Sequence, residues 1–119
     1  MLTNLDMVRG DTFTRTIEFT ENGSSLNITG WTVFFTLKQN WQLPDSEASL
    51  QKIITNHTDP TNGKTVLELL PADTVTLNPG EFDYDIQALT DDNEVFTLLR
   101  GKFTIEYDVT RGTAGIAGT

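Results

Sequence analysis

The chain has 119 residues without a single cysteine, and its 17 acidic residues outnumber 8 basic ones to give a net charge of -9. A negative field of this size repels phosphate backbones and anionic lipid head groups, so nucleic acid and membrane surfaces are poor candidate partners. The absence of cysteine excludes disulfide scaffolds and thiolate catalysis. A hydrophobic fraction of 37% supports a packed core, and the length suits one domain that folds without a metal.

The first residues carry neither the basic segment nor the apolar run of a signal peptide. No stretch approaches the ~18 apolar residues that a membrane span needs. We therefore expect a soluble protein that is made in the cytoplasm.

Alternating apolar and polar side chains predict several strands in the first part of the chain. Residues 11–20 form the first such segment. Asn22-Gly23 is a strong hairpin signal and predicts a short return strand at residues 26–28. Residues 31–38 predict a central strand, and Phe34 on its otherwise polar face indicates partial cover on that side.

Two further apolar segments, residues 50–55 and 65–70, flank a stretch dense in turn residues. This arrangement predicts a second hairpin with a longer loop. Pro71 followed by Asp73 then predicts one short helical turn near residues 71–75.

The clearest β pattern is a hairpin at residues 79–105. Apolar residues alternate with polar ones from Phe82 to Ala88, and an Asp-Asp-Asn-Glu cluster supplies the turn. The second strand changes parity along its length. A β-bulge between Leu98 and Gly101 would reconcile the two halves, because one extra residue shifts the parity.

Together these elements predict an all-β fold, an immunoglobulin-like antiparallel β-sandwich of about seven strands over residues 1–109. Trp31 is a candidate for the large residue between the sheets, and Phe82 stands where such folds place a corner tyrosine. Residues 110–119 are rich in Gly, Ala and Thr without any period, which predicts a flexible C-terminal arm.

No set of residues predicts catalysis. General base chemistry would fall to His57 alone, and no nucleophile motif or phosphate-binding loop is present, so we expect no enzyme and no cofactor. Asp83 and Asp85 are interpreted as a solvated acidic face rather than a calcium site, so no metal site is expected. Arg9-Gly10-Asp11 spells an integrin-binding tripeptide and is interpreted as a solvated bend.

Trp41 and Leu43 are apolar residues in an otherwise polar segment. Either they form a contact patch, since aromatic anchors dominate interfaces, or their loop folds back over the open end of the sandwich. Both alternatives stay open from the sequence. Arg111 and Ile116 in the C-terminal arm complete the candidate interface.

Several blocks of turn and strand residues resemble those of small tailed-phage structural proteins. The blocks are Arg9-Gly10-Asp11-Thr12-Phe13, Ile28-Thr29-Gly30-Trp31-Thr32-Val33, Thr58-Asp59-Pro60 with Gly63-Lys64-Thr65, Pro79-Gly80-Glu81-Phe82-Asp83-Tyr84-Asp85-Ile86-Gln87, Thr97-Leu98-Leu99 with Gly101-Lys102-Phe103, and Asp108-Val109-Thr110-Arg111. In particular, the pattern resembles the immunoglobulin-like N-terminal domain of phage baseplate upper proteins.

This resemblance implies a non-enzymatic virion component, made in the host cytoplasm and placed at a baseplate, tail or head accessory position. Its partners would be other phage structural proteins, with a homo-oligomer as one form of assembly. The chain stops at Thr119, where the baseplate protein would continue, and this favours an adaptor or decoration role.

A carbohydrate-binding β-sandwich module is the alternative function. It would need exposed aromatic rings on one face or in one cleft to stack on sugar rings. Trp41, Phe34 and Tyr107 are the candidates that the sequence offers.

Overall fold

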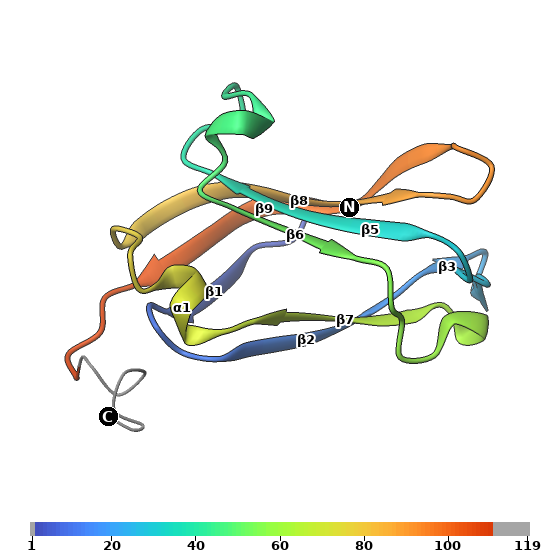
Figure 1. Ribbon diagram of the computed structural model, residues 1–119, viewed down its shortest axis with the longest axis horizontal. Helices are drawn as coiled ribbons and strands as arrows, with labels where there is room; N and C mark the ends of the chain where they lie inside the picture. Colours follow the sequence, from blue (N-terminus) through green and yellow to red (C-terminus); the bar gives the residue numbers. More distant parts are fainter. Residues whose placement is uncertain (1, 111–119) are drawn as a thin grey trace.

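The computed structural model describes residues 2–110, which form two layers of β-strands (Figure 1). One layer is a five-stranded sheet in the order β1-β9-β8-β5-β6, and the facing layer is the β2-β7 pair. A small β3-β4 hairpin extends the second layer. The strands are β1 (Leu5–Val8), β2 (Phe13–Glu18), β3 (Thr20–Glu21), β4 (Ser24–Ser25), β5 (Thr32–Lys38), β6 (Leu50–Ile54), β7 (Lys64–Leu69), β8 (Gly80–Leu89) and β9 (Val95–Glu106). The prediction of an all-β sandwich is confirmed.

Short helical segments occur only in the connections of this part of the chain. They are the 3-10 turns η1 (Asp45–Glu47) and η2 (Pro60–Asn62) and the single α-helical turn α1 (Pro71–Thr74). The helical turn predicted near residues 71–75 is therefore confirmed. None of the helices within residues 2–110 is long and apolar enough to cross a membrane.

The core lies between the inner faces of the two layers. Phe103 of β9 occupies its centre, with ring centroids 5.4 Å from Phe13 of β2, 5.8 Å from Phe35 of β5 and 5.9 Å from Tyr84 of β8. Each large apolar side chain buried in this way contributes about 1.5–3 kcal/mol to the free energy of unfolding. The alternation in the sequence therefore predicted correctly which faces of β5 and β8 are buried.

The β8-β9 hairpin contains the predicted bulge. Ile86 pairs with Leu99 and Gln87 pairs with Thr97, so Leu98 is the extra residue on β9. The bulge keeps Phe96 and Phe103 on the core face although they differ in parity.

The N-terminal strand β1 was not predicted, and it lies parallel to β9 at one edge of the five-stranded sheet. The chain enters it through Thr3, whose N–H donates to the Arg100 carbonyl at 2.8 Å. The Tyr84 hydroxyl donates to the Thr3 carbonyl at 2.7 Å. Gly101 permits this close approach, because a Cβ at that position would overlap the Thr3 carbonyl.

The predicted second hairpin is wrong. Its two strands are present, but β6 pairs with β5 in the five-stranded sheet and β7 pairs with β2 in the other layer. The connection crosses between the layers and is held by His57, whose ring nitrogens lie 2.8 Å from the Trp31 carbonyl and 2.9 Å from the Thr65 hydroxyl. A carbonyl only accepts, so Nε2 donates to Trp31.

A smaller prediction near the same end of the sandwich is also corrected. The return strand is Ser24–Ser25 rather than residues 26–28, because Asn22 and Gly23 both adopt positive φ and close a tight two-residue turn. Trp31 is half-buried at this end of the sandwich, edge-on to Phe19, which follows β2, and to Phe96 of β9, with ring centroids 5.8 and 5.5 Å apart, so it packs between rings from the two layers.

The described strands all lie within residues 2–110, and the predicted division into a domain over residues 1–109 and an arm over residues 110–119 stays a prediction. The predicted C-terminal arm lies outside the described residues except for Thr110.

The close approach at Gly101 can be tested with a matched pair of glycine substitutions. Gly101 and Gly80 share a similar φ, at +159° and +153°, but a Cβ on Gly80 meets nothing within 4 Å. We expect Gly101→Ala to lower the free energy of unfolding by about 1–3 kcal/mol more than Gly80→Ala, because it overpacks the β1 contact. Urea unfolding measures the difference, and equal losses in the two variants would contradict the packing described here.

Candidate binding surface

The outer face of the five-stranded sheet is turned away from the second layer and forms an open depression. Its volume is about 1140 Å³, and β5, β8 and β9 provide its floor. The floor includes Phe34, Thr36, Asp85, Gln87 and Arg100. Residues of the N-terminal segment line one side, and Trp41 lines it from the loop between β5 and β6.

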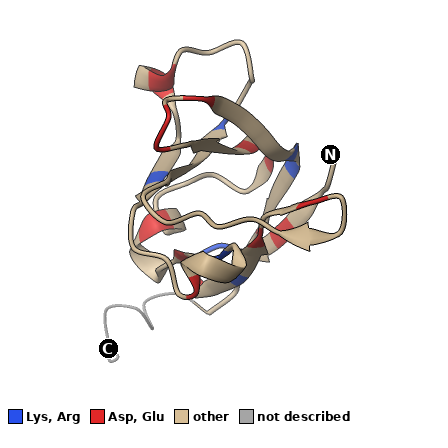
Figure 2. Cartoon of the chain, turned by 90° about the vertical axis from the view of Figure 1, so that its right-hand side faces the viewer, with Lys and Arg blue, Asp and Glu red and all other residues tan. Residues whose placement is uncertain are grey.

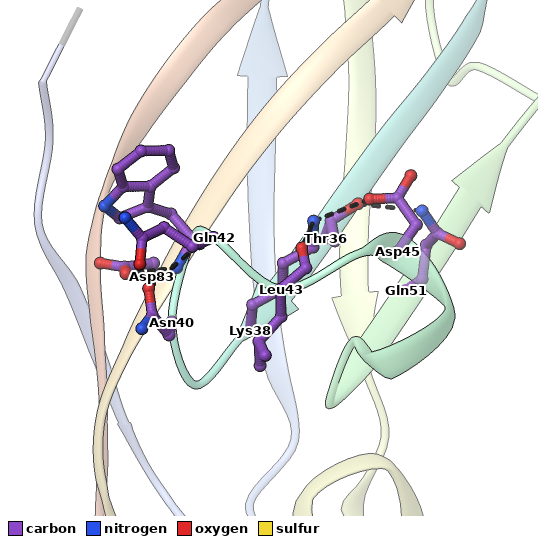
Figure 3. Close-up of polar contacts among 9 residues, drawn as sticks. Thr36, Lys38, Asn40, Gln42, Leu43, Asp45, Gln51 and Asp83 are labelled. Atoms are coloured by element: carbon purple, nitrogen blue, oxygen red, sulfur yellow. Dashed lines mark hydrogen bonds and ion pairs between the residues drawn. The ribbon is translucent and has the colours of Figure 1, made fainter.

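The loop at residues 39–49 projects beyond the sheet and is fixed to it at two points (Figures 1 and 3). At one point, Lys38 Nζ donates to the Leu43 carbonyl at 2.8 Å and pairs with Asp45 Oδ1 at 2.8 Å. At the other, the Trp41 N–H donates to Asp83 Oδ2 at 2.8 Å. Both anchors are outward-facing side chains of neighbouring strands, so the sheet itself sets the position of the loop.

Asp83 connects this loop to β9. Its second oxygen accepts a hydrogen bond from Lys102 Nζ at 2.7 Å. The Lys102 bond is the main reason that the pKa of Asp83 is lowered, and the Trp41 N–H adds to the effect. The same bond raises the pKa of Lys102. Asp83 is thus an ionised acceptor that ties the Trp41 backbone to the rim of the depression.

Asp85 and Arg100 lie directly opposite each other on β8 and β9. Within residues 2–110, neither side chain makes a hydrogen bond or ion pair with another residue. Partial burial raises the pKa of Asp85. The floor therefore presents one acceptor group and one donor group whose hydrogen-bonding capacity is not used by the fold.

Charges balance within the depression, although the chain as a whole carries -9. Three carboxylates (Asp45, Asp83, Asp85) and three cations (Lys38, Arg100, Lys102) line it. The other acidic residues are scattered over strands and loops rather than gathered on one face (Figure 2). The depression is thus polar but close to neutral.

The structure describes two of the four predicted interface residues. Trp41 is 71% exposed and lines the depression, so its side chain does not cover the open end of the sandwich. Leu43 is half-buried and contributes its carbonyl to the Lys38 anchor. Arg111 and Ile116 lie outside the described residues. Their assignment to an interface stays a prediction.

Two of the residues considered for catalysis or metal binding, His57 and Asp83, have structural partners. Both ring nitrogens of His57 are engaged in the crossing between the layers. Asp83 is held by Lys102 and Trp41. In the part of the chain that the structure describes, no group of three His, Cys, Asp or Glu side chains could hold a metal ion.

A second surface lies at the end of the sandwich where β1, α1 and β9 meet, on the left of Figure 1. Arg9 is not a solvated bend residue as predicted, because Nη2 pairs with Asp108 at 2.8 Å and Nη1 donates to the Leu77 carbonyl at 3.1 Å. The Gly10 N–H donates to the Thr74 hydroxyl at 2.8 Å. The segments joined in this way expose four large apolar side chains: Leu70, Val75, Tyr107 and Val109. We call these four residues the apolar end.

Comparison with known proteins finds similarity of fold only. No protein-family profile matches the chain, and no curated protein matches it in sequence. Among solved structures, it is similar to the N-terminal domain of phage TP901-1 ORF48, with 14% identity over 92% of this chain and 86% of that one and a TM-score of 0.48. It is also similar to CopC from Methylosinus trichosporium OB3b, with 11% identity, coverage of 90% and 87% and a TM-score of 0.49.

Fibronectin(III)-like modules of Clostridium thermocellum CbhA form another such neighbour, with 12% identity, coverage of 89% and 90% and a TM-score of 0.47. The neighbours include phage and non-phage proteins. They share a broad architecture with this chain and assign no activity to it.

The two aspartates of the depression should respond to pH with opposite sign. The pKa of Asp83 is lowered by folding, so its stabilising effect is present at neutral pH and is lost as the pH falls through the folded-state pKa. The pKa of Asp85 is raised, so its ionised form opposes folding at neutral pH, and protonation removes that penalty.

We therefore expect Asp83→Asn to destabilise and Asp85→Asn to stabilise the protein at about pH 7, with both differences shrinking near pH ~3. Urea unfolding at the two pH values measures this. Changes of the same sign in both variants would contradict the assigned environments.

Proposed function

We propose that the chain is a non-enzymatic structural or adaptor protein of a tailed-phage virion that acts through protein–protein assembly. The residue blocks between Arg9 and Arg111, which resemble phage structural proteins, support the virion assignment. The observation that carries the assembly role is the apolar end, where four exposed apolar side chains lie on segments that Arg9 and Gly10 join. Baseplate, tail and head accessory positions are all compatible with this proposal.

The contacts that hold the segments of the apolar end together favour binding. Arg9 bonds Asp108 through both Nε, at 2.9 Å, and Nη2, and the Arg9 and Asp108 side chains are only 16% and 11% exposed. This contact fixes the segment between Tyr107 and Val109 against the N-terminal part of the chain. A segment whose backbone is held before association loses less conformational freedom when a partner binds.

Sheet edges offer a further means of attachment. β6 is one edge of the five-stranded sheet and exposes Ile53, and β1 is the other edge. An edge strand has backbone groups that an added strand can pair with. Multiple copies could therefore contact one another through edges as well as through the apolar end.

The virion assignment is tested by purifying particles from cells that express the coding sequence together with its genomic neighbours. We expect density-gradient-purified particles to contain the chain in a fixed copy number, measured by quantitative mass spectrometry. Abundant chain in the lysate without any in intact particles would contradict the assignment.

The apolar end is tested with two valines at opposite ends of the molecule. Val109 lies at the apolar end, and Val95, also exposed, lies at the far end of the β8-β9 hairpin. We expect the wild-type chain to self-associate in light scattering after size exclusion, and Val109→Asp to weaken the association at least ~10-fold, because a charge replaces a desolvated contact.

Val95→Asp is the matched control and should leave the association unchanged. Equal effects of the two substitutions would contradict a role for the apolar end. A parallel measurement on a chain ending at Val109 tests the predicted arm, whose removal should also lower the oligomer size.

A further inference from the structure

The depression on the outer sheet face displays an exposed aromatic ring on an anchored loop. Trp41 is 71% exposed, yet its backbone is tied to Asp83, and its loop is tied to Lys38. Large aromatic side chains are enriched at binding surfaces, where they contribute much of the binding energy. Phe34 is half-buried on the floor of the same depression, so it offers a second ring.

Polar groups surround these rings. Gln87 pairs in register with Phe34, and Asp85 pairs with Thr36 on one side and Arg100 on the other. Carboxylate, amide and guanidinium groups are planar and can bond two neighbouring hydroxyls at once. No hydrogen bond or ion pair is formed within residues 2–110 by the Asp85 carboxylate or the Arg100 guanidinium, and Asp85 is only near the charge of Lys38, so both groups can bond a ligand.

The size and the charge of the depression limit the kinds of ligand that it can bind. A volume of about 1140 Å³ has room for several rings of an extended ligand rather than for a single small molecule. Opposite charges in equal number favour a ligand without net charge, and the overall charge of -9 disfavours phosphates and other polyanions. A wholly apolar peptide face would leave the polar floor buried without partners.

We propose that this depression is a binding site for a neutral oligosaccharide. Trp41 and Phe34 stack on the apolar faces of sugar rings, and Asp85, Gln87 and Arg100 bond the ring hydroxyls. The site lies on the sheet face and is separate from the apolar end, so it does not depend on the assembly role.

The test is calorimetric titration of the full chain with neutral hexasaccharides built from glucose, mannose, xylose or galactose. A heparin hexasaccharide and an oligouronate serve as anionic contrasts. We expect at least one neutral probe to bind and the anionic probes to bind more weakly. Absence of binding to all neutral probes at about 5 mM, well above the ~1 mM range of weak specific binding, or binding of anionic probes alone, would overturn the proposal.

Substitutions locate the binding. Trp41→Ala should lower the affinity at least ~10-fold, whereas Tyr107→Ala should leave it within ~2-fold. Tyr107 is a matched control for Trp41, because its side chain is also 71% exposed but lies at the apolar end. Arg100→Ala and Arg15→Ala form a second pair of exposed residues, inside and outside the depression.

Circular dichroism confirms that each variant is folded, which is expected because all four side chains are exposed. Sugar binding that survives Trp41→Ala and Arg100→Ala would overturn the proposal. Val109→Asp should retain sugar binding, so loss of assembly and loss of sugar binding are distinguishable.

Discussion

The β-bulge at Leu98 is the constraint on which both faces of the main sheet depend. It places Phe96 and Phe103 on the core side of β9, and it places Arg100 and Lys102 on the outer side, opposite Asp85 and Asp83. Without the extra residue, one half of the strand would turn its apolar side chains to water. One local irregularity therefore sets the packing of the core and the chemistry of the depression together.

The β1 edge of the sheet also depends on β9. Gly101 lies just beyond the bulge and leaves space for Thr3. The Thr3 carbonyl accepts a hydrogen bond from the Tyr84 hydroxyl. The parallel pairing of β1 with β9 starts two residues later, at Leu5. The paired strand then leads to Arg9, which fixes the apolar end by binding Asp108. The bulge region is thus connected to both candidate surfaces through short, specific contacts.

Much of this fold could be predicted from the sequence, because alternation reports which face of a strand is buried. The β8-β9 hairpin and its bulge were predicted for this reason, whereas the turn at α1 was predicted from Pro71 and Asp73. Alternation does not report which layer a strand joins, so β6 and β7 were wrongly paired. β1 was missed because it has four residues and a partner almost 100 positions away.

The candidate site was predictable only in part. An exposed tryptophan in a polar loop was a visible signal, and Asp83 and Asp85 were correctly expected to face outward. Their relation to Trp41 was not visible, because the bond from Trp41 to Asp83 spans 42 positions. The side of the sheet on which Arg100 lies depends on the exact residue that forms the bulge.

The outer sheet face, with the backbone of Trp41 anchored at its rim, is proposed as a preformed binding surface. Amide and indole NMR spectra of the full chain, recorded during titration with the neutral hexasaccharides, test it most directly. We expect shift changes confined to the Trp41 indole and to amides of β5, β8 and β9 around the depression, without changes in the core or at the apolar end. Changes centred on the apolar end, or spread evenly over the sandwich, would contradict it.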